Sequence, residues 1–294
     1  MNKHGTKGQL KSALYVFTAG MLWGCMGILV RKMYAVGLTT MEIVAFRSVV
    51  TAAVMFVGML LLNRKALKIR LKDCWCFFGT GIVSVVFFNL CYFLCMDYTT
   101  LSTAAILLYT APAFVMLMSF LLFKERFTKR KVLALFLAFI GCVLVSGGFS
   151  GALITKMGLL TGLGAGFGYA LYSIFGRYAI KRGYSSLTIT TYTFLFASIG
   201  SIPFCDVQGL TATMQKDLQL FLFCFMITVL VTVLPYILYT KGLSGIENSK
   251  ASIIASIEPV MASVVGFMLF SEIPTVTGIS GMILVLASTV ICCL

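Results

Sequence analysis

The stretch YTAPAFVMLMSFLLFKERFT at residues 109–128 has a related stretch, SIEPVMASVVGFMLFSEIPT, at residues 256–275. Each is an apolar run of helical length with a proline near its start and a glutamate just after its end. A single spacing, 147 residues, separates the matching prolines, glutamates and threonines. These matches are Pro112 with Pro259, Glu125 with Glu272, and Thr128 with Thr275.

A second pair of phrases supports this duplication. Residues 20–24 read GMLWG and precede Arg31, and residues 166–170 read GFGYA and precede Arg177. These phrases lie 146 residues apart. One such match arises easily by chance, but five matches at nearly one offset do not. The chain is therefore predicted to consist of two related halves.

The composition indicates a membrane protein. Of the 294 residues, 60% are hydrophobic and 11% are charged, and the mean hydropathy is +1.02. A soluble domain has about 25% charged residues, because its surface must stay hydrated. A membrane helix needs roughly 20 mostly apolar residues, and ten segments meet this requirement. The predicted all-α membrane fold has transmembrane helices at residues 12–30, 41–62, 74–95, 102–123, 132–148, 158–180, 185–204, 218–240, 249–270 and 275–293.

The ten helices divide into two five-helix repeats, residues 12–148 and residues 158–293. Five is an odd number, so the second repeat crosses the membrane in the opposite direction to the first. Inverted repeats of this kind recur in secondary transporters, whose substrate site lies near the midplane between the halves. Strands are disfavoured, because transmembrane strands carry polar residues at every second position and these segments do not. The longest connector, residues 205–217, is expected to be a surface loop.

The net charge of +14 reports topology and does not indicate nucleic acid as a partner, because Lys and Arg gather on the cytoplasmic side of membrane proteins. With the N-terminus in the cytoplasm, 18 of the 23 Lys and Arg residues fall on that side and 4 on the other. The basic start of the chain resembles a signal peptide, but residues 12–30 form a longer run without a small-residue cleavage site. We therefore expect a retained first helix and a multi-pass protein of the cell membrane with both termini cytoplasmic.

The pattern resembles the EamA family of the drug/metabolite transporter superfamily over essentially residues 12–293. The phrases that carry the resemblance are Trp23-Gly24, the surroundings of Arg47, KERFT at residues 124–128, Glu258-Pro259, and EIPT at residues 272–275. The resemblance implies a ten-helix exporter with a central cavity lined by helices one, three, four, six, eight and nine. It also implies transport without ATP, and the sequence contains no GxxxxGK[ST] phosphate loop.

Two charged residues lie inside predicted helices, where ionisable groups are functional candidates by default. Glu258 lies near mid-bilayer directly before Pro259. It is a candidate for coupling export to proton entry or for contacting a cationic group of the solute, and the alternative is a structural carboxylate at a kink. Arg47 is a candidate partner for Glu258 or for substrate anions. The alternative for Arg47 is a head group that reaches the interface or neighbouring carbonyls.

Aromatic and polar residues recur at helical spacing on several predicted helices. They predict an aromatic cavity with hydroxyl donors, suited to an amphipathic or aromatic solute or to a cation above π faces. The alternative is that these residues form interfacial belts or core packing. The candidate cavity residues are Trp23, Asn89, Tyr92, Tyr109, Tyr169, Tyr172, Tyr236, Tyr239 and Ser256.

The remaining distinctive residues are interpreted as architecture. Gly20, Gly24 and Gly166 belong to small-residue faces that let helix backbones approach closely. Glu125 and Glu272 are expected to form salt bridges at opposite faces of the membrane. Most cysteines lie in apolar runs, where thiols behave as small hydrophobes, and no metal or other cofactor is expected.

A polytopic membrane chain can be a transporter, an intramembrane enzyme, or a receptor or partner subunit. A secondary transporter of a small metabolite, amino acid or drug-like solute, with proton exchange as a candidate driving force, agrees best with the inverted repeat. An intramembrane enzyme is disfavoured, because a nucleophile–base pair or a metal cluster is needed and the only histidine is His4 in the basic tail. A receptor, a non-transporting partner or a lipid-carrier flippase subunit stays open, as does a homodimer.

Overall fold

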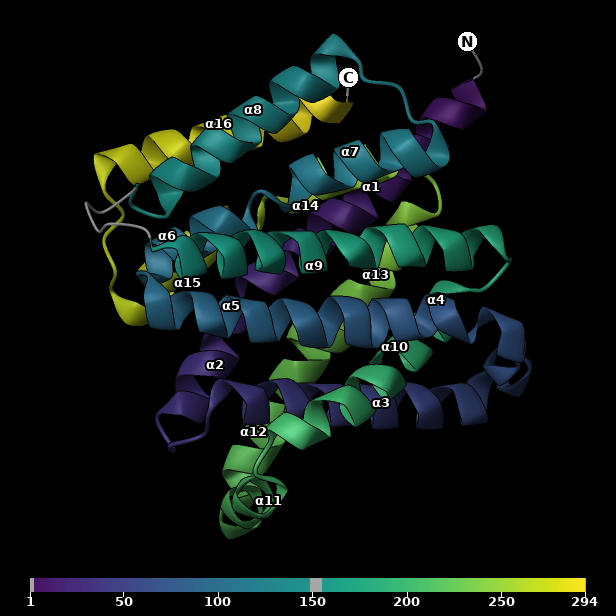
Figure 1. Cartoon of the computed structure of the whole chain (residues 1–294), viewed down its shortest axis with the longest axis vertical. Helices are drawn as coiled ribbons and strands as arrows, with labels where there is room; N and C mark the ends of the chain where they lie inside the picture. The colour runs from purple at the N-terminus through teal and green to yellow at the C-terminus, as the bar shows by residue number, and fades with distance from the viewer. Residues whose placement is uncertain (1–2, 149–154, 294) are drawn as a thin grey trace.

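The computed structural model describes residues 3–148 and 155–293, and within these ranges it is helical without strands. Within the described residues, nine helical stretches, several of them made of two or three consecutive labelled segments, are long and apolar enough to cross a membrane. The tenth is α8 (Lys129–Val145), whose 17 residues make it slightly shorter than the others. It packs along α16 (Val276–Cys293), and Figure 1 shows this pair on one side of the bundle. The predicted ten-helix fold is confirmed.

The first repeat is built from interrupted and continuous helices. Its first span is α1 (Lys3–Gly24) with α2 (Met26–Tyr34), and its second is α3 (Thr40–Leu62). Its third span is α4 (Cys74–Phe78), the π-helical segment η3 (Gly79–Val86) and α5 (Phe87–Tyr98). Its fourth is α6 (Leu101–Leu108) with α7 (Ala111–Phe123), and its fifth is α8. Short 3-10 turns, η1 (Arg64–Leu67) and η2 (Leu71–Asp73), connect the second span to the third.

The second repeat has the same order of spans. The first is α9 (Lys156–Lys181), and the second is α10 (Ser186–Ser201) with the turn η4 (Ile202–Phe204). The third is α12 (Leu218–Thr228), the π-helical segment η5 (Val229–Val233) and α13 (Leu234–Leu243). The fourth is α14 (Asn248–Ala255) with α15 (Glu258–Phe270), and the fifth is α16.

The interruptions of the third and fourth spans fall at equivalent places in the two repeats, whereas the break at Cys25 between α1 and α2 has no counterpart in the continuous helix α9. The π-helical segments end at Val86 and Val233, which are 147 residues apart. The fourth span and the ninth span each break just before a proline, Pro112 or Pro259, which occupies the first turn of the following helix. Proline is accepted there because the first N–H groups of a helix have no intrahelical partner. The structure therefore repeats the 147-residue offset of the sequence.

Glycines allow the first helix of each repeat to lie against the break in the other repeat. A Cβ atom at Gly20 would lie 2.8 Å from the Ala255 carbonyl oxygen, and one at Gly166 would lie 3.0 Å from the Leu107 carbonyl oxygen. Such approaches leave no room for a side chain, which is the packing role predicted from the small-residue pattern. Helix α1 packs on α13, and α9 packs on α5, so the two repeats interlock at the centre of the bundle.

The connector at residues 205–217 differs from the expected loop. It contains a further helix, α11 (Val207–Lys216), which begins at the capping carboxylate of Asp206. Leu210 and Met214, four residues apart, face the same way and are buried against the bundle. This one-turn spacing of apolar residues gives an otherwise polar segment enough burial to form a helix.

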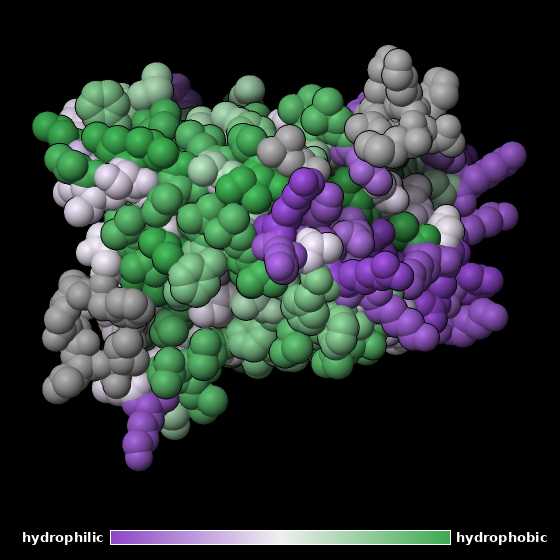
Figure 2. Space-filling model, turned by 90° about the horizontal axis from the view of Figure 1, so that it is seen from above, coloured by the Kyte–Doolittle hydropathy of each residue, from purple (hydrophilic) through white to green (hydrophobic). Residues whose placement is uncertain are grey.

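Charged residues gather at one end of the bundle, and Figure 2 shows a hydrophobic girdle beside it. We call this the basic end. It is the end where α7, α9 and α13 finish and where Lys124, Lys181 and Lys241 lie. Arg31 and Glu272 lie at the opposite end, where α2 and α15 finish.

Candidate functional site: an aromatic cavity between the repeats

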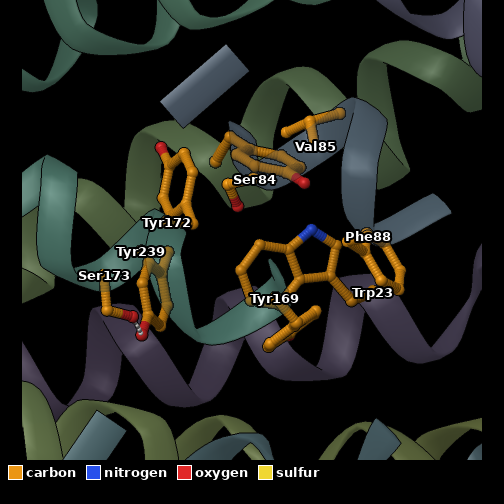
Figure 3. A pocket seen from close by; sticks show the side chains of 9 residues that line it. Trp23, Ser84, Val85, Phe88, Tyr169, Tyr172, Ser173 and Tyr239 are labelled. Carbon is orange, nitrogen blue, oxygen red and sulfur yellow. Dashed lines mark hydrogen bonds between the residues drawn. The ribbon is translucent and has the colours of Figure 1, made fainter. Parts of the chain in front are cut away.

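Five of the nine predicted cavity residues line one cavity at the centre of the bundle (Figure 3). Trp23 comes from α1, Tyr169 and Tyr172 come from α9, and Tyr236 and Tyr239 come from α13. The first helix of each repeat thus contributes an aromatic wall, and α13 of the second repeat closes the space between them. The cavity lies where the two repeats meet.

The aromatic rings pack edge to face around Trp23. Its ring centroid lies 5.2 Å from that of Tyr236 with an interplanar angle of 75°, and 5.2 Å from that of Tyr239. Tyr169 lies 6.3 Å away at 69°. Tilted and edge-to-face pairs at these separations are favoured by the ring quadrupoles and are worth about 0.5–1.5 kcal/mol each beyond burial. The wall is therefore held in a definite shape.

Hydroxyl groups of the wall are fixed by hydrogen bonds between α9 and α13. The hydroxyls of Tyr172 and Thr240 lie 2.7 Å apart. The hydroxyls of Ser173 and Tyr239 also lie 2.7 Å apart (Figure 3). Buried polar groups are costly unless they are paired. These bonds therefore orient both tyrosine rings without exposing their hydroxyls to lipid.

A second cavity adjoins the first and contains the Glu258 carboxylate. It is lined by Tyr109, Tyr169, Ser256 and Glu258, and it follows the break between α14 and α15. The Tyr169 hydroxyl donates a hydrogen bond of 3.5 Å to Glu258 Oε2. Tyr169 lines both cavities and therefore stands between the aromatic wall and the carboxylate.

The last three predicted residues lie around these cavities. Arg47 donates from Nε to the Thr232 hydroxyl at 3.1 Å and forms no ion pair with Glu258 in the described conformation. Asn89 in α5 is buried and donates to the carbonyl oxygen of Val85 in η3 at 2.7 Å, within the third span. Tyr92 packs with Phe88 at 6.1 Å between ring centroids.

Three lining residues from the third span were not predicted. They are Ser84 and Val85 in the π-helical segment η3 and Phe88 in α5. The spacing of an ideal α-helix places Asn89 and Tyr92 on the predicted cavity face. A π-helical segment bonds residue i to residue i+5, so it rotates the preceding residues relative to the following ones. This register change brings Ser84 and Val85 to the cavity, and no residue type in the sequence marks it.

Both cavities are small in the described conformation. Each has a volume of about 20 Å³, which is enough for one or two water molecules. A cavity that holds a small organic molecule measures roughly 300–1,000 Å³. A small organic molecule could therefore fit between these helices only if they moved apart.

The fold and this cavity define a class: a polytopic α-helical membrane protein with two inverted halves and a polar, aromatic space between them, the architecture that recurs in membrane transporters. The chain belongs to the EamA-like transporter family, whose model matches residues 10–147 and 156–294. The family is one of transporters, and the chain is a multi-pass membrane protein.

Several relatives support the assignment. An "Uncharacterized transporter" of Archaeoglobus fulgidus is 29% identical over 200 residues, which cover 68% of this chain and 70% of that protein. The "Uncharacterized transporter YyaM" of Bacillus subtilis is 25% identical over 82% of this chain and 81% of its own length. The "Uncharacterized inner membrane transporter YicL" of Salmonella typhimurium is 23% identical and covers 96% of this chain and 94% of its own length. A solved structure titled "Crystal structure of protein" shares the fold with a TM-score of 0.79, at 16% identity and 95% coverage of both chains.

Proposed function

We propose that this chain is a secondary transporter that exports a small amphipathic solute across the cytoplasmic membrane by alternating access. The solute is a metabolite, an amino acid or a drug-like molecule with an aromatic or apolar part. The aromatic wall around Trp23 packs against that part, and Glu258 contacts a polar or cationic group. Transport is driven by proton exchange or by the gradient of the solute itself.

The observation that carries this proposal is the position of Tyr169. Its ring belongs to the aromatic wall, and its hydroxyl contacts Glu258 in the adjoining cavity at 3.5 Å. One side chain thus links an apolar surface to an ionisable group deep in the membrane. An amphipathic molecule that replaced Tyr169 in this contact would bury its apolar part and satisfy its polar part together.

Glu258 is also the candidate for proton coupling. It lies at the first residue of α15, beside the break, and lines the cavity that faces Tyr109 and Ser256. Carboxylates inside membrane segments are rare and often belong to proton pathways. Protonation of Glu258 removes its charge and frees Tyr169 to contact the solute.

Orientation follows from the basic end. The basic end faces the cytoplasm, since Lys and Arg mark the cytoplasmic side of short membrane loops. Both termini then lie in the cytoplasm, and the solute leaves at the opposite end of the bundle.

Two measurements test the proposal in sequence. The detergent-solubilised protein is screened with amino acids, metabolites and aromatic amines for an increase in Tm, because a ligand that binds the native state stabilises it. Each stabilising compound is then tested for flux in liposomes that contain only this chain. Saturable flux of a stabilising compound supports the proposal, whereas binding without flux would identify a receptor or a non-transporting partner.

A further inference from the structure

The two repeats carry equivalent glutamates in equivalent backbone settings. Glu125 follows α7 and Glu272 follows α15, each directly after a residue in the left-handed conformation, Lys124 with φ 58° or Ser271 with φ 56°. In the described part of the chain these two are the only non-glycine residues with positive φ. Side chains rarely adopt this conformation. The same strained turn therefore presents a carboxylate at each end of the bundle.

At the basic end, Glu125 caps a helix that lies far away in the sequence. Its Oε1 accepts a hydrogen bond from the Asn248 backbone N–H at 2.8 Å. Its Oε2 accepts from the backbone N–H and the hydroxyl of Ser249 at 3.2 Å and 2.6 Å. The first N–H groups of a helix lack intrahelical partners and favour negative charge. Glu125 therefore ties the end of α7 to the start of α14.

No side chain adjacent to α14 in the sequence caps its N-terminus in place of Glu125. The N-cap residue of α14, Glu247, makes no side-chain cap, and its carboxylate pairs with Lys131 Nζ at 2.5 Å. Arg177 at the end of α9 donates to the Asn248 side-chain oxygen at 2.6 Å and to the Ile246 carbonyl oxygen. Helices α7, α9 and α14 thus converge, and α7 packs against α14. These contacts cover the start of α14 at the basic end, where Asn248 and Ser249 are 0% and 1% exposed.

At the opposite end, the equivalent glutamate is engaged elsewhere. Glu272 Oε1 accepts from Arg31 Nη2 at 2.6 Å, and the two side chains are 54% and 49% exposed. Arg31 is itself the counterpart of Arg177. Helix α15 makes at most marginal contact with α6, although the equivalent pair at the basic end packs closely. The salt bridge predicted for Glu272 is therefore present. Glu125 instead accepts hydrogen bonds from the start of α14.

The repeat offset identifies the residues that Glu272 would cap. The counterparts of Asn248 and Ser249 are Leu101 and Ser102, at the start of α6. Ser102 retains the hydroxyl that Ser249 uses to bind Glu125, and its side chain is partly exposed. A carboxylate at this position would accept from the Ser102 backbone N–H and hydroxyl, as Glu125 does from Ser249.

We propose that Glu125 and Glu272 are alternating capping groups that shut the two ends of the transporter in turn. In the state described here, Glu125 caps α14 and the basic end is shut. In the other state Glu125 releases α14, and Glu272 leaves Arg31 to cap α6 through Ser102. This inference rests on the proposed function, because alternating capping has a role only in a chain that opens at each end.

The test measures opening of the basic end and needs no solute. Ser252 is buried one turn along α14 from Ser249 and lines the cavity with Glu258. In a Ser252→Cys protein in detergent, the rate at which the introduced thiol reacts with a charged, water-soluble maleimide is followed by peptide mass spectrometry. Adding Glu125→Ala is expected to raise this rate about tenfold, since losing a capping side chain shifts an equilibrium by about that factor. Glu272→Ala, which removes the cap of the other state, is expected to leave the rate at or below that of the Ser252→Cys parent.

Two further variants control for a general loss of stability. Asp217 accepts a hydrogen bond from the Leu220 N–H at 3.0 Å and so caps α12, the helix that directly follows it in the sequence. This cap does not join two distant helices, so Asp217→Ala is expected to leave the labelling rate unchanged. Glu125→Gln keeps one acceptor oxygen and nearly the same volume, so it is expected to give a smaller increase than Glu125→Ala. Equal rates in Glu125→Ala and Asp217→Ala, or an equal increase in Glu272→Ala, would overturn the proposal. If the labelling rates follow this pattern but the parent protein shows no solute flux in liposomes, the proposed transport function is wrong and the capping proposal is not.

Discussion

Removing the ring of Tyr169 should weaken solute binding more than removing its hydroxyl. The ring makes edge-to-face contacts with Trp23 at 6.3 Å and with Phe88 at 5.5 Å between centroids. Its hydroxyl makes one long hydrogen bond, 3.5 Å, to Glu258. A ring contact is worth about 0.5–1.5 kcal/mol, and a solute that uses the same ring face loses a similar amount for each contact. A hydrogen bond contributes about 0.5–1.5 kcal/mol net, with a long bond at the lower limit.

These magnitudes separate two variants. Tyr169→Ala should raise the half-saturation concentration for transport roughly tenfold to a hundredfold, corresponding to about 1.4–2.8 kcal/mol. Tyr169→Phe should raise it less than about threefold, because the ring contacts remain. The measurement is initial-rate uptake in proteoliposomes across a range of solute concentrations, with Tm recorded for each protein.

Phe167→Ala is the matched control. Phe167 lies on the same helix two residues earlier, is 40% exposed and packs against Phe114 at 5.7 Å. Its loss should affect stability without affecting half-saturation. If Tyr169→Ala is folded and transports with the parental half-saturation concentration, then Tyr169 does not line the solute path.

Three other outcomes are expected. Glu258→Gln keeps the volume of the side chain and should abolish the response of flux to an imposed pH gradient while preserving Tm; an unchanged response would make Glu258 structural. Gly24→Ala should destabilise the protein by about 1–3 kcal/mol, because its Cβ would lie 2.5 Å from the Glu258 carbonyl oxygen. Gly27→Ala is the control, because its Cβ would meet open space. Equal Tm values for the two variants would refute the close packing at Gly24. A reporter fused after Lys131 should be cytoplasmic and one within residues 208–213 external, and the reverse pattern would invert the proposed orientation.

The large-scale fold could be predicted from sequence because lipid imposes simple rules. Each span must be apolar over helical length, and the 147-residue offset relates the spans of the two halves. The breaks before Pro112 and Pro259 also follow from the sequence, since proline removes a donor and clashes with the preceding turn. Five of the nine predicted cavity residues line the aromatic cavity, and two more, Tyr109 and Ser256, line the adjoining one with Glu258.

The details that escaped prediction depend on contacts between distant segments. The π-helical segment Gly79–Val86 changes which face of the third span meets the cavity, and its residues have no type that distinguishes it from an α-helix. Helix α11 forms because Leu210 and Met214 find a partner surface. Glu125 was expected to form a salt bridge, but the start of α14 offers N–H donors that the sequence does not place beside it. Each difference arises from tertiary packing.

Tyr236 differs from Tyr169 in how closely its ring is packed. Tyr236 is 9% exposed, and its ring centroid lies within 5.2 Å of those of Trp23, Tyr172 and Phe194. A residue with three such neighbours supports the shape of the wall, so its removal would disturb folding together with binding. Tyr169 has the contact with Glu258 and is therefore the sharper test of the cavity.

Counterflow measures directly whether this chain alone carries a solute through alternating access. Liposomes containing only this protein are loaded with an unlabelled stabilising solute and diluted into a trace of the labelled form. A transient accumulation of label that requires internal solute is expected, because a carrier exchanges one molecule for another across the membrane. Equal entry into protein-free liposomes, or entry independent of internal solute, would rule out carrier-type exchange by this chain.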